Sequence, residues 1–278
     1  MLFAPFSLPE CLPMNPEVIA TDHRIGLVLL SFAISAIGAY TALAAAAAAV
    51  RRSRPGQLDR LNVALAGLSL GGIAIWSMHF IGMIAWQVDI GVGYRLLETL
   101  VSLVAAVVVS TVALGWVVAS GGQLSRIAVA GPLAGLGVAA MHYLGMASMR
   151  FSGYFVWDMA IVALSVLIAM AAASAALWLA FRTPSRGHRA GAALLMAGAV
   201  CTMHYTGMAG ATVVCTSREP NPLLAQLLRP ADLPVPVIAV AGCIALIIGL
   251  DLWMQRMTGQ RHSPGTAATA RRSVRRPS

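Results

Sequence analysis

The chain has 278 residues, of which 59% are hydrophobic and only 10% are charged, and its formal net charge is +9. A soluble domain of this length is normally about one quarter charged, so the composition excludes an ordinary water-soluble globular protein and favours a body surrounded by lipid. The basic residues are all Arg. The absence of Lys excludes a retinal pigment, because a retinal Schiff base needs a Lys amine.

Seven segments are long and apolar enough to be transmembrane helices, since about 20 apolar residues cross the hydrocarbon core of a bilayer. In chain order they are residues 25–50, 61–86, 98–119, 127–149, 157–181, 190–214 and 235–257. Short polar connections separate most of them, and the longest connection, residues 215–234, contains four prolines. The sequence therefore predicts a polytopic membrane protein with seven transmembrane helices.

The distribution of Arg predicts the orientation of these helices. With the N-terminus outside, the inner segments and tail hold 14 of the 19 Arg and the outer segments hold five. Because cytoplasmic segments are enriched in Arg, we expect the N-terminus outside and the C-terminus in the cytoplasm. We divide the chain into an extracytoplasmic N-terminal segment (1–22), a membrane domain (23–257) and a disordered basic cytoplasmic tail (258–278). The tail is expected to contact lipid head groups, not nucleic acid.

A six-residue motif, Met-His-x-x-Gly-Met, occurs three times, at residues 78–83, 141–146 and 203–208. Its His residues are 63 and 62 positions apart, which indicates an internal repeat of two predicted helices. The predicted fold class is therefore all-α: a membrane helix bundle of three two-helix repeats plus one extra helix.

The motif has a defined geometry on a helix. The His and the Met four positions later lie on nearly the same face, and the Gly between them lets another helix come close. All three helices run from inside to outside, so the three His are expected at one depth, roughly 10 Å below the outer interface. A His inside the hydrocarbon is costly without a partner and marks a functional site. The alternative is a neutral His that bonds to a neighbouring helix.

Imidazole and thioether groups together form a soft ligand set that suits copper, especially Cu(I), although haem iron also accepts His and Met. The predicted metal ligands are the His and the two Met of each motif: Met78, His79, Met83, Met141, His142, Met146, Met203, His204 and Met208. The four Cys lack the spacing of a zinc site. Cys11 and Cys215 both fall on the predicted outer side, so a disulfide between them is an open alternative.

Residues 203–206 read Met-His-Tyr-Thr. The three-motif arrangement resembles the MHYT domain, a bacterial integral membrane sensor domain, over roughly residues 23–257. The resemblance implies a place in the bacterial inner membrane and copper held by the motif Met and His, which responds to oxygen, carbon monoxide or nitric oxide. The first motif departs from the pattern, with Phe80-Ile81 in place of Tyr-Thr.

Many relatives carry fused cytoplasmic output modules, whereas we expect a stand-alone domain here that works with a separate cytoplasmic output protein. The leading hypothesis is a copper-binding sensor whose partners are the lipid bilayer and a diatomic gas. A copper transport or handling protein and a haem-binding electron carrier are the alternatives. We expect no enzyme activity, because no paired carboxylates or nucleophile constellation is present in the sequence.

Overall fold

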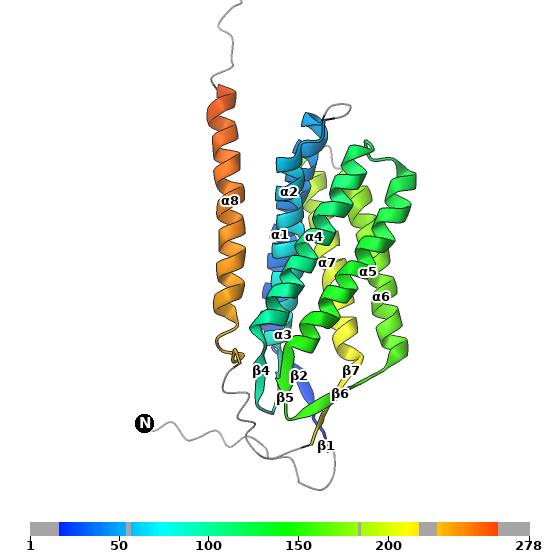
Figure 1. Cartoon of the computed structure of the whole chain (residues 1–278), viewed down its shortest axis with the longest axis vertical. Coiled ribbons are helices and arrows are strands. Elements are labelled where there is room, and N and C mark those ends of the chain that lie inside the picture. The colour runs from blue at the N-terminus through cyan, green and yellow to red at the C-terminus, as the bar shows by residue number, and fades with distance from the viewer. Residues whose placement is uncertain (1–16, 54–56, 183–184, 217–226, 261–278) are drawn as a thin grey trace, which may run out of the picture. The chain divides into compact units, whose positions relative to one another are not determined.

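The computed structural model describes residues 17–53, 57–182, 185–216 and 227–260. Within these ranges seven helices are long and apolar enough to cross a membrane, as predicted. They are α1 (Ile25–Arg52), the continuous helix Arg60–Ala85, α4 (Leu96–Ala119), α5 (Leu124–Ser148), α6 (Met159–Ala180), α7 (Arg186–Ala209) and α8 (Pro234–Gln260). The helix Arg60–Ala85 consists of α2 (Arg60–Gly67), a π-helical stretch η1 (Leu68–Ser77) and α3 (Met78–Ala85). The all-α fold class is confirmed (Figure 1).

The chain divides into two compact units, residues 1–244 and residues 245–278. The site discussed below lies in the first unit. In the second unit, the described residues continue α8 to Gln260. Most of the predicted N-terminal segment (1–16) and of the predicted tail (261–278) lies outside the described residues.

The three motif-bearing helices form the interior of the bundle. The most apolar window is 83% buried in the helix Arg60–Ala85, 50% in α5 and 44% in α7, against 33% in α1, 39% in α4 and 17% in α6. Small residues allow the close packing. A Cβ on Gly135 of α5 would lie 2.4 Å from the Cα of Met170 in α6, so only Gly fits there.

Short strands at one end of the bundle close each repeat (Figure 1). Each repeat reads strand, outer helix, motif helix, strand, and its two strands pair antiparallel. The pairs are β2 (Thr21–His23) with β3 (Trp86–Val88), β4 (Val92–Tyr94) with β5 (Met149–Phe151), and β6 (Gly153–Trp157) with β7 (Ala211–Cys215), while β1 (Glu17–Val18) joins the other edge of β7. The two-helix repeat inferred from the motif spacing is thus a β-α-α-β unit.

One backbone hydrogen bond recurs in all three repeats. The N–H of the residue before the outer helix donates to a carbonyl at the end of the motif helix, at 2.9 Å each time. The three bonds run from Arg24 to Ala85, from Arg95 to Ser148 and from Asp158 to Gly210. They hold the end of each motif helix against the start of its own outer helix, so the three motifs are fixed in equivalent positions.

The predicted sixth span, residues 190–214, is wrong at its C-terminal end. Helix α7 ends at Ala209, and residues 211–215 form β7. The sequence of β7, Ala-Thr-Val-Val-Cys, is apolar and β-branched, so hydropathy alone cannot distinguish it from a continuing helix. Its pairing with β6 along five residues decides in favour of a strand.

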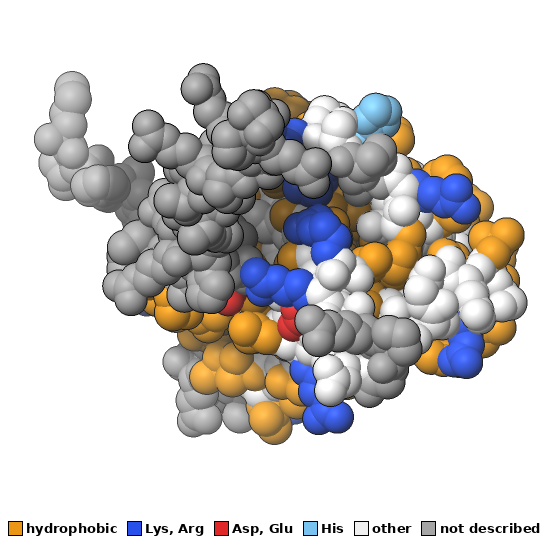
Figure 2. All heavy atoms as spheres, turned by 90° about the horizontal axis from the view of Figure 1, so that it is seen from above, with side chains coloured by type: hydrophobic (Ala, Val, Ile, Leu, Met, Phe, Trp, Pro, Cys, Tyr) orange, Lys and Arg blue, Asp and Glu red, His pale blue; other side chains and the backbone are white. Residues whose placement is uncertain are grey.

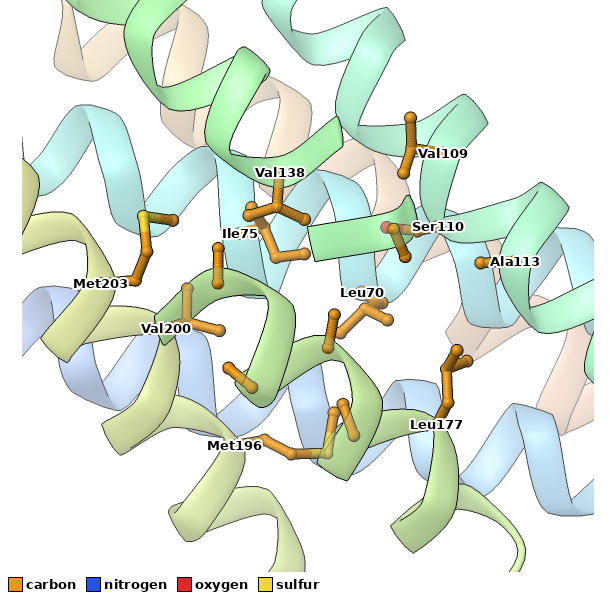
Figure 3. A pocket seen from close by; sticks show the side chains of 15 residues that line it. Leu70, Ile75, Val109, Ser110, Ala113, Val138, Leu177, Met196, Val200 and Met203 are labelled. Carbon is orange, nitrogen blue, oxygen red and sulfur yellow. The ribbon is translucent and has the colours of Figure 1, made fainter. Parts of the chain in front are cut away.

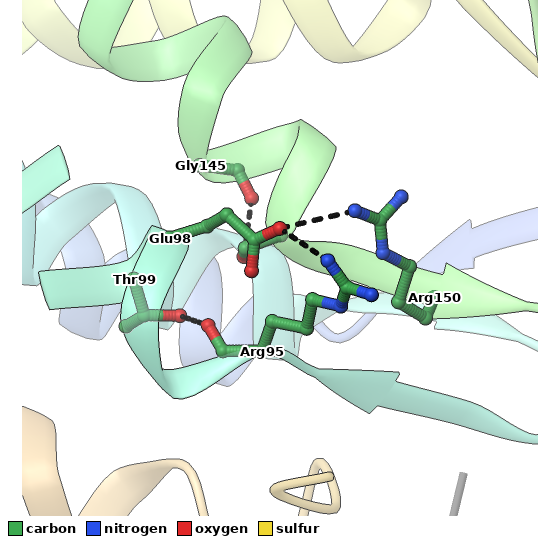
Figure 4. Close-up of polar contacts among 6 residues, drawn as sticks. Arg95, Glu98, Thr99, Gly145 and Arg150 are labelled. Atoms are coloured by element: carbon green, nitrogen blue, oxygen red, sulfur yellow. Dashed lines mark hydrogen bonds and ion pairs between the residues drawn. The ribbon is translucent and has the colours of Figure 1, made fainter. Parts of the chain in front are cut away.

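A carboxylate joins the start of α4 to the end of the second motif helix (Figure 4). Glu98 in the first turn of α4 lies 3.0 Å from Arg95 and 3.1 Å from Arg150 of β5. Near it, the Ser148 hydroxyl donates to the Gly145 carbonyl at 2.6 Å. A negative charge is favourable at a helix N-terminus, so Glu98 stabilises α4 and ties β5 to it.

Arg side chains gather at the end of the bundle opposite the strands, and Figure 2 looks onto this end. At that end α1 finishes, α2 and α5 begin, and α6 is joined to α7. The Arg residues there are Arg51, Arg52, Arg60, Arg126, Arg182, Arg186 and Arg189. Because the described part of the strand end contains fewer Arg (Arg24, Arg95, Arg150 and Arg229), the two ends differ in charge as the sequence predicts.

Candidate metal centre

The three motif His meet at the centre of the bundle, one each from α3, α5 and α7. The Nδ1 atoms are 3.1 Å apart for His79 and His204, 3.1 Å for His79 and His142, and 3.2 Å for His142 and His204. The side chains are between 0% and 1% exposed. The rings meet edge to face, with centroids 4.9 to 5.1 Å apart. We call this near-equilateral arrangement the histidine triangle.

Hydrogen bonds among its members cannot satisfy the histidine triangle. A neutral His nitrogen either donates a hydrogen bond or accepts one, and does not do both. In a ring of three nitrogens, at least two of the same kind must therefore face each other, two N–H groups or two lone pairs. Such a contact at about 3.1 Å is unfavourable in a buried site. A cation shared by three lone pairs removes the conflict.

The dimensions of the histidine triangle fit a metal ion. His nitrogens in a tetrahedral site lie ~2.0–2.1 Å from the metal, which places them ~3.3–3.4 Å from one another. The observed separations of 3.1 to 3.2 Å differ from this by about 0.2 Å, the tolerance expected for a metal site. The three side chains thus match one face of a four-coordinate site and leave a fourth position for another ligand.

The motif Gly residues make room for the His rings of other motifs. A Cβ on any of them would lie 2.2 to 2.4 Å from a His Nε2 atom, closer than any real contact. The facing pairs are Gly82 with His204, Gly145 with His79, and Gly207 with His142. The order is cyclic, so each motif receives the ring of the preceding one. Sequence reasoning assigned these Gly residues to helix approach in general, and the structure shows which ring each accommodates.

The surroundings of the histidine triangle are dry and uncharged. The three Nε2 atoms are buried and have no hydrogen-bond partner among the described residues. In the described part of residues 17–244, the buried polar side chains include no carboxylate. A bound ion would therefore keep its own charge in a medium of low dielectric constant. The cost of burial rises steeply with charge, so a monovalent ion is favoured over a divalent one.

The six motif methionines are all buried, with exposed fractions between 0% and 2%. All but Met78 belong to the hydrophobic cluster around the site. The sequence predicts that each His shares a ligand set with the Met four positions later. The structure brings the three His of different motifs together, and the role of the methionines as metal ligands stays a prediction.

Two motif Tyr residues connect the site to outer helices. The Tyr143 hydroxyl is 2.6 Å from the Ser165 hydroxyl of α6, and the Tyr205 hydroxyl is 2.9 Å from the Ser31 hydroxyl of α1. Each Tyr ring also packs edge to face on the His that precedes it, with centroids 4.8 and 4.7 Å apart. These contacts couple the ring positions in the histidine triangle to α1 and α6.

The first motif has a different arrangement at this position. Phe80 packs on His79 with centroids 4.8 Å apart, but it has no hydroxyl. The neighbouring outer helix α4 carries Ser102, whose hydroxyl receives a hydrogen bond from the Trp76 indole at 3.1 Å. The Trp76 indole thus replaces the Tyr hydroxyl as the polar link between a motif helix and its neighbour.

The strand end lies close to the third motif. The His23 ring in β2 is 5.7 Å from the ring of Tyr205, which itself packs on His204. Cys215 of β7 is disulfide-bonded, while Cys201 and Cys243 are free. Cys11, the partner considered in the sequence, lies outside the described residues.

Burial raises the pKa of the Tyr94 phenol in β4, so that phenol stays neutral at physiological pH.

Comparison with known proteins gives the family. A family model described as "MHYT: Bacterial signalling protein N terminal repeat" matches residues 72–130 and 135–193, which contain the first two motifs. The chain is 41% identical over 200 residues to the bifunctional diguanylate cyclase/cyclic di-GMP phosphodiesterase MucR of Pseudomonas aeruginosa, covering 70% of this chain and 29% of the relative. It is 34% identical over 243 residues to an uncharacterized signaling protein of Caulobacter vibrioides, covering 87% and 28%.

A third relative, the cyclic di-GMP phosphodiesterase NbdA of Pseudomonas aeruginosa, is 36% identical over 216 residues, covering 72% of this chain and 26% of the relative. The chain thus spans less than a third of the length of these curated relatives. No solved structure matches it. The chain belongs to the MHYT family, and it forms a multi-pass membrane domain of bacterial signalling proteins.

Proposed function

We propose that this chain is a membrane sensory domain whose histidine triangle binds a single copper ion, held as Cu(I). The observation that carries the proposal is the triangle of Nδ1 atoms at 3.1 to 3.2 Å, since three buried imidazoles cannot satisfy one another without a shared cation. The absence of a buried carboxylate in the described part of residues 17–244 favours a monovalent ion. Imidazole and thioether ligands favour copper among the common metals.

His79, His142 and His204 would hold the ion, and its fourth position would go either to a motif methionine sulfur or to a diatomic gas. When bound, Cu(I) would supply a soft, redox-active centre able to bind a diatomic gas at this fourth position. The protein excludes water from this position, because the three His are between 0% and 1% exposed. The motif Gly residues leave the space that the His rings occupy. The Tyr–Ser hydrogen bonds would transmit a displacement of the rings to α1 and α6.

The alternatives fit these observations less well. The three His rings contact one another directly, so no space for a haem remains between them. Transport of an ion needs polar groups along a path. The layer of side chains one helical turn from the triangle, on the side away from the strands, is apolar. It consists of Ile75, Val138 and Val200.

We further propose that the strand end faces the periplasm and that the Arg-rich end faces the cytoplasm of a bacterial inner membrane. A cytoplasmic output protein would then respond to the helix positions, and the activities named for MucR and NbdA point to cyclic di-GMP turnover as the output. Reporter fusions to the connections α1–α2 and α3–α4 test the orientation. A periplasmic reporter that is active at the first connection and inactive at the second contradicts it.

Metal analysis of protein purified from membranes tests the copper site. The wild type should contain one copper per chain, and His142→Ala should lose most of it. His188→Ala is the matched control, because His188 lies in the exposed first turn of α7 and contacts Ser185. Wild-type protein without copper after reconstitution with Cu(I), or undiminished copper in a variant with all three motif His replaced by Ala, overturns the proposal.

A further inference from the structure

An apolar cavity of about 50 Å³ lies inside the bundle, between η1, α4, α5, α6 and α7 (Figure 3). Alanines of α6 form one wall, and branched side chains from the other helices form the rest. None of these residues belongs to the histidine triangle. The cavity is therefore a second feature of the interior, and of the motif residues only Met203 contributes to its lining.

The cavity lies in register with the histidine triangle. Ile75, Val138 and Val200 line it, and each stands four residues before a motif His in the sequence. Four residues are about one helical turn, or ~5.4 Å along the axis. Met203, which precedes His204, also lines it. Figure 3 shows Ile75, Val138, Val200 and Met203 converging on one side of the cavity. The cavity thus begins about one helical turn from the triangle, on the side away from the strands.

The lining selects small apolar ligands. Ser110 is the one residue of the lining with a side-chain hydroxyl, and the others are aliphatic or methionine. A buried water needs two to four polar partners, so this cavity is too apolar to hold ordered water although it is large enough. Apolar cavities of this kind stay dry and take up apolar molecules or noble gases. A diatomic gas matches both the size and the polarity.

A groove on the lipid-facing side adjoins the cavity. Val109, Ala113 and Ala134 line both the cavity and this groove between α4 and α5. The outer rim of the groove is formed by exposed apolar residues of the same helices, among them Val112 at 63% and Leu133 at 57% exposure. Apolar gases dissolve better in the hydrocarbon core than in water. The membrane itself is therefore the source that supplies the cavity.

We propose that this cavity is a gas-binding site, filled laterally from the lipid between α4 and α5, which holds a diatomic gas one helical turn from the histidine triangle. The identity of the gas and its use as a signal rest on the proposed sensory function. The binding of an apolar gas in the cavity does not depend on copper. The two proposals therefore fail independently.

Xenon is a suitable probe, because it is apolar and can be applied under pressure to copper-free protein in lipid nanodiscs. We expect a saturable shift of the methyl NMR signals of Ile75, Val138 and Val200 in the wild type. Ala173→Val adds two methyl groups to the cavity wall and should abolish the shift. The matched control is Ala175→Val, since Ala175 lies on the exposed face of the same helix. Ala113→Val fills the cavity from α4 and serves if Ala173→Val does not fold.

The outcomes separate clearly. A wild type without saturable methyl shifts overturns the cavity proposal, as does a cavity-filling variant that folds and responds to xenon like the wild type. Copper content measured on the same variants should be unchanged, since neither Ala173 nor Ala113 belongs to one of the three motifs. Xenon binding in a protein that takes up no copper would support the cavity and contradict the metal site.

Discussion

Replacement of Gly145 by Ala is the sharpest test of the cyclic packing in the site. The new Cβ would lie 2.2 Å from Nε2 of His79, whereas an ordinary contact begins at 3.4 Å. The ring edge of His79 must therefore move by the difference, 3.4 − 2.2 = 1.2 Å. Metal–ligand distances tolerate only about 0.2 Å, so this movement withdraws one of the three nitrogens. We expect the affinity for Cu(I) to fall by about 10- to 100-fold.

Gly191→Ala is the matched control, because Gly191 lies on the motif helix α7 and a Cβ there meets nothing within 4 Å. Both substitutions gain about 1 kcal/mol in helix propensity, so the difference between them isolates the collision with the ring. Competition with a chromogenic Cu(I) chelator measures the affinity, and thermal unfolding of the same samples measures stability. Gly207→Ala should behave similarly, since its Cβ would lie 2.4 Å from His142. If Gly145→Ala binds Cu(I) as tightly as Gly191→Ala does, the reasoning is refuted.

Substitutions at three further positions test the supports of the site by thermal unfolding. Tyr205→Phe should cost about 0.5–1.5 kcal/mol by removing the hydrogen bond to the Ser31 hydroxyl, and an unchanged midpoint would contradict a role for that bond. Asp158→Ala should cost about 1 kcal/mol, because the carboxylate caps α6 by accepting from two backbone N–H groups, whereas Asp158→Asn should retain most of the stability. Glu98→Gln should cost at most about 1 kcal/mol, since its Arg partners are about half exposed, and added salt should reduce the difference from wild type. A salt-independent effect would assign Glu98 another role.

The sequence was sufficient to predict the helices and the common depth of the motifs. Hydropathy reports the length of each apolar segment, and a repeat of 62 to 63 residues requires equivalent positions along the bundle. Both properties are local or periodic. Because hydropathy is a local property, the predicted start of the third helix at residue 98 lies only two residues from the start of α4 at Leu96.

The contacts between motifs could not be predicted in the same way. Helical periodicity relates a His to the Gly and Met of its own motif, but it carries no information on which helix stands opposite. That His204 faces Gly82 and His79 faces Gly145 follows from the cyclic order of the helices, which is a tertiary property. The strand β7 was missed because apolar β-branched residues suit a strand and a membrane helix equally well.

The number of repeats explains why the proposed site suits a bound ion. Two facing imidazoles can form a hydrogen bond in which one donates and the other accepts, and four can form two such pairs. Three equivalent imidazoles always leave an unmatched contact. The Gly residues behind them remove the space constraint on the rings without offering a hydrogen-bond acceptor. The threefold repeat therefore places three imidazole nitrogens around one point in a dry medium. A soft cation shared by them would stabilise this arrangement, and any change at that cation would disturb all three motif helices at once.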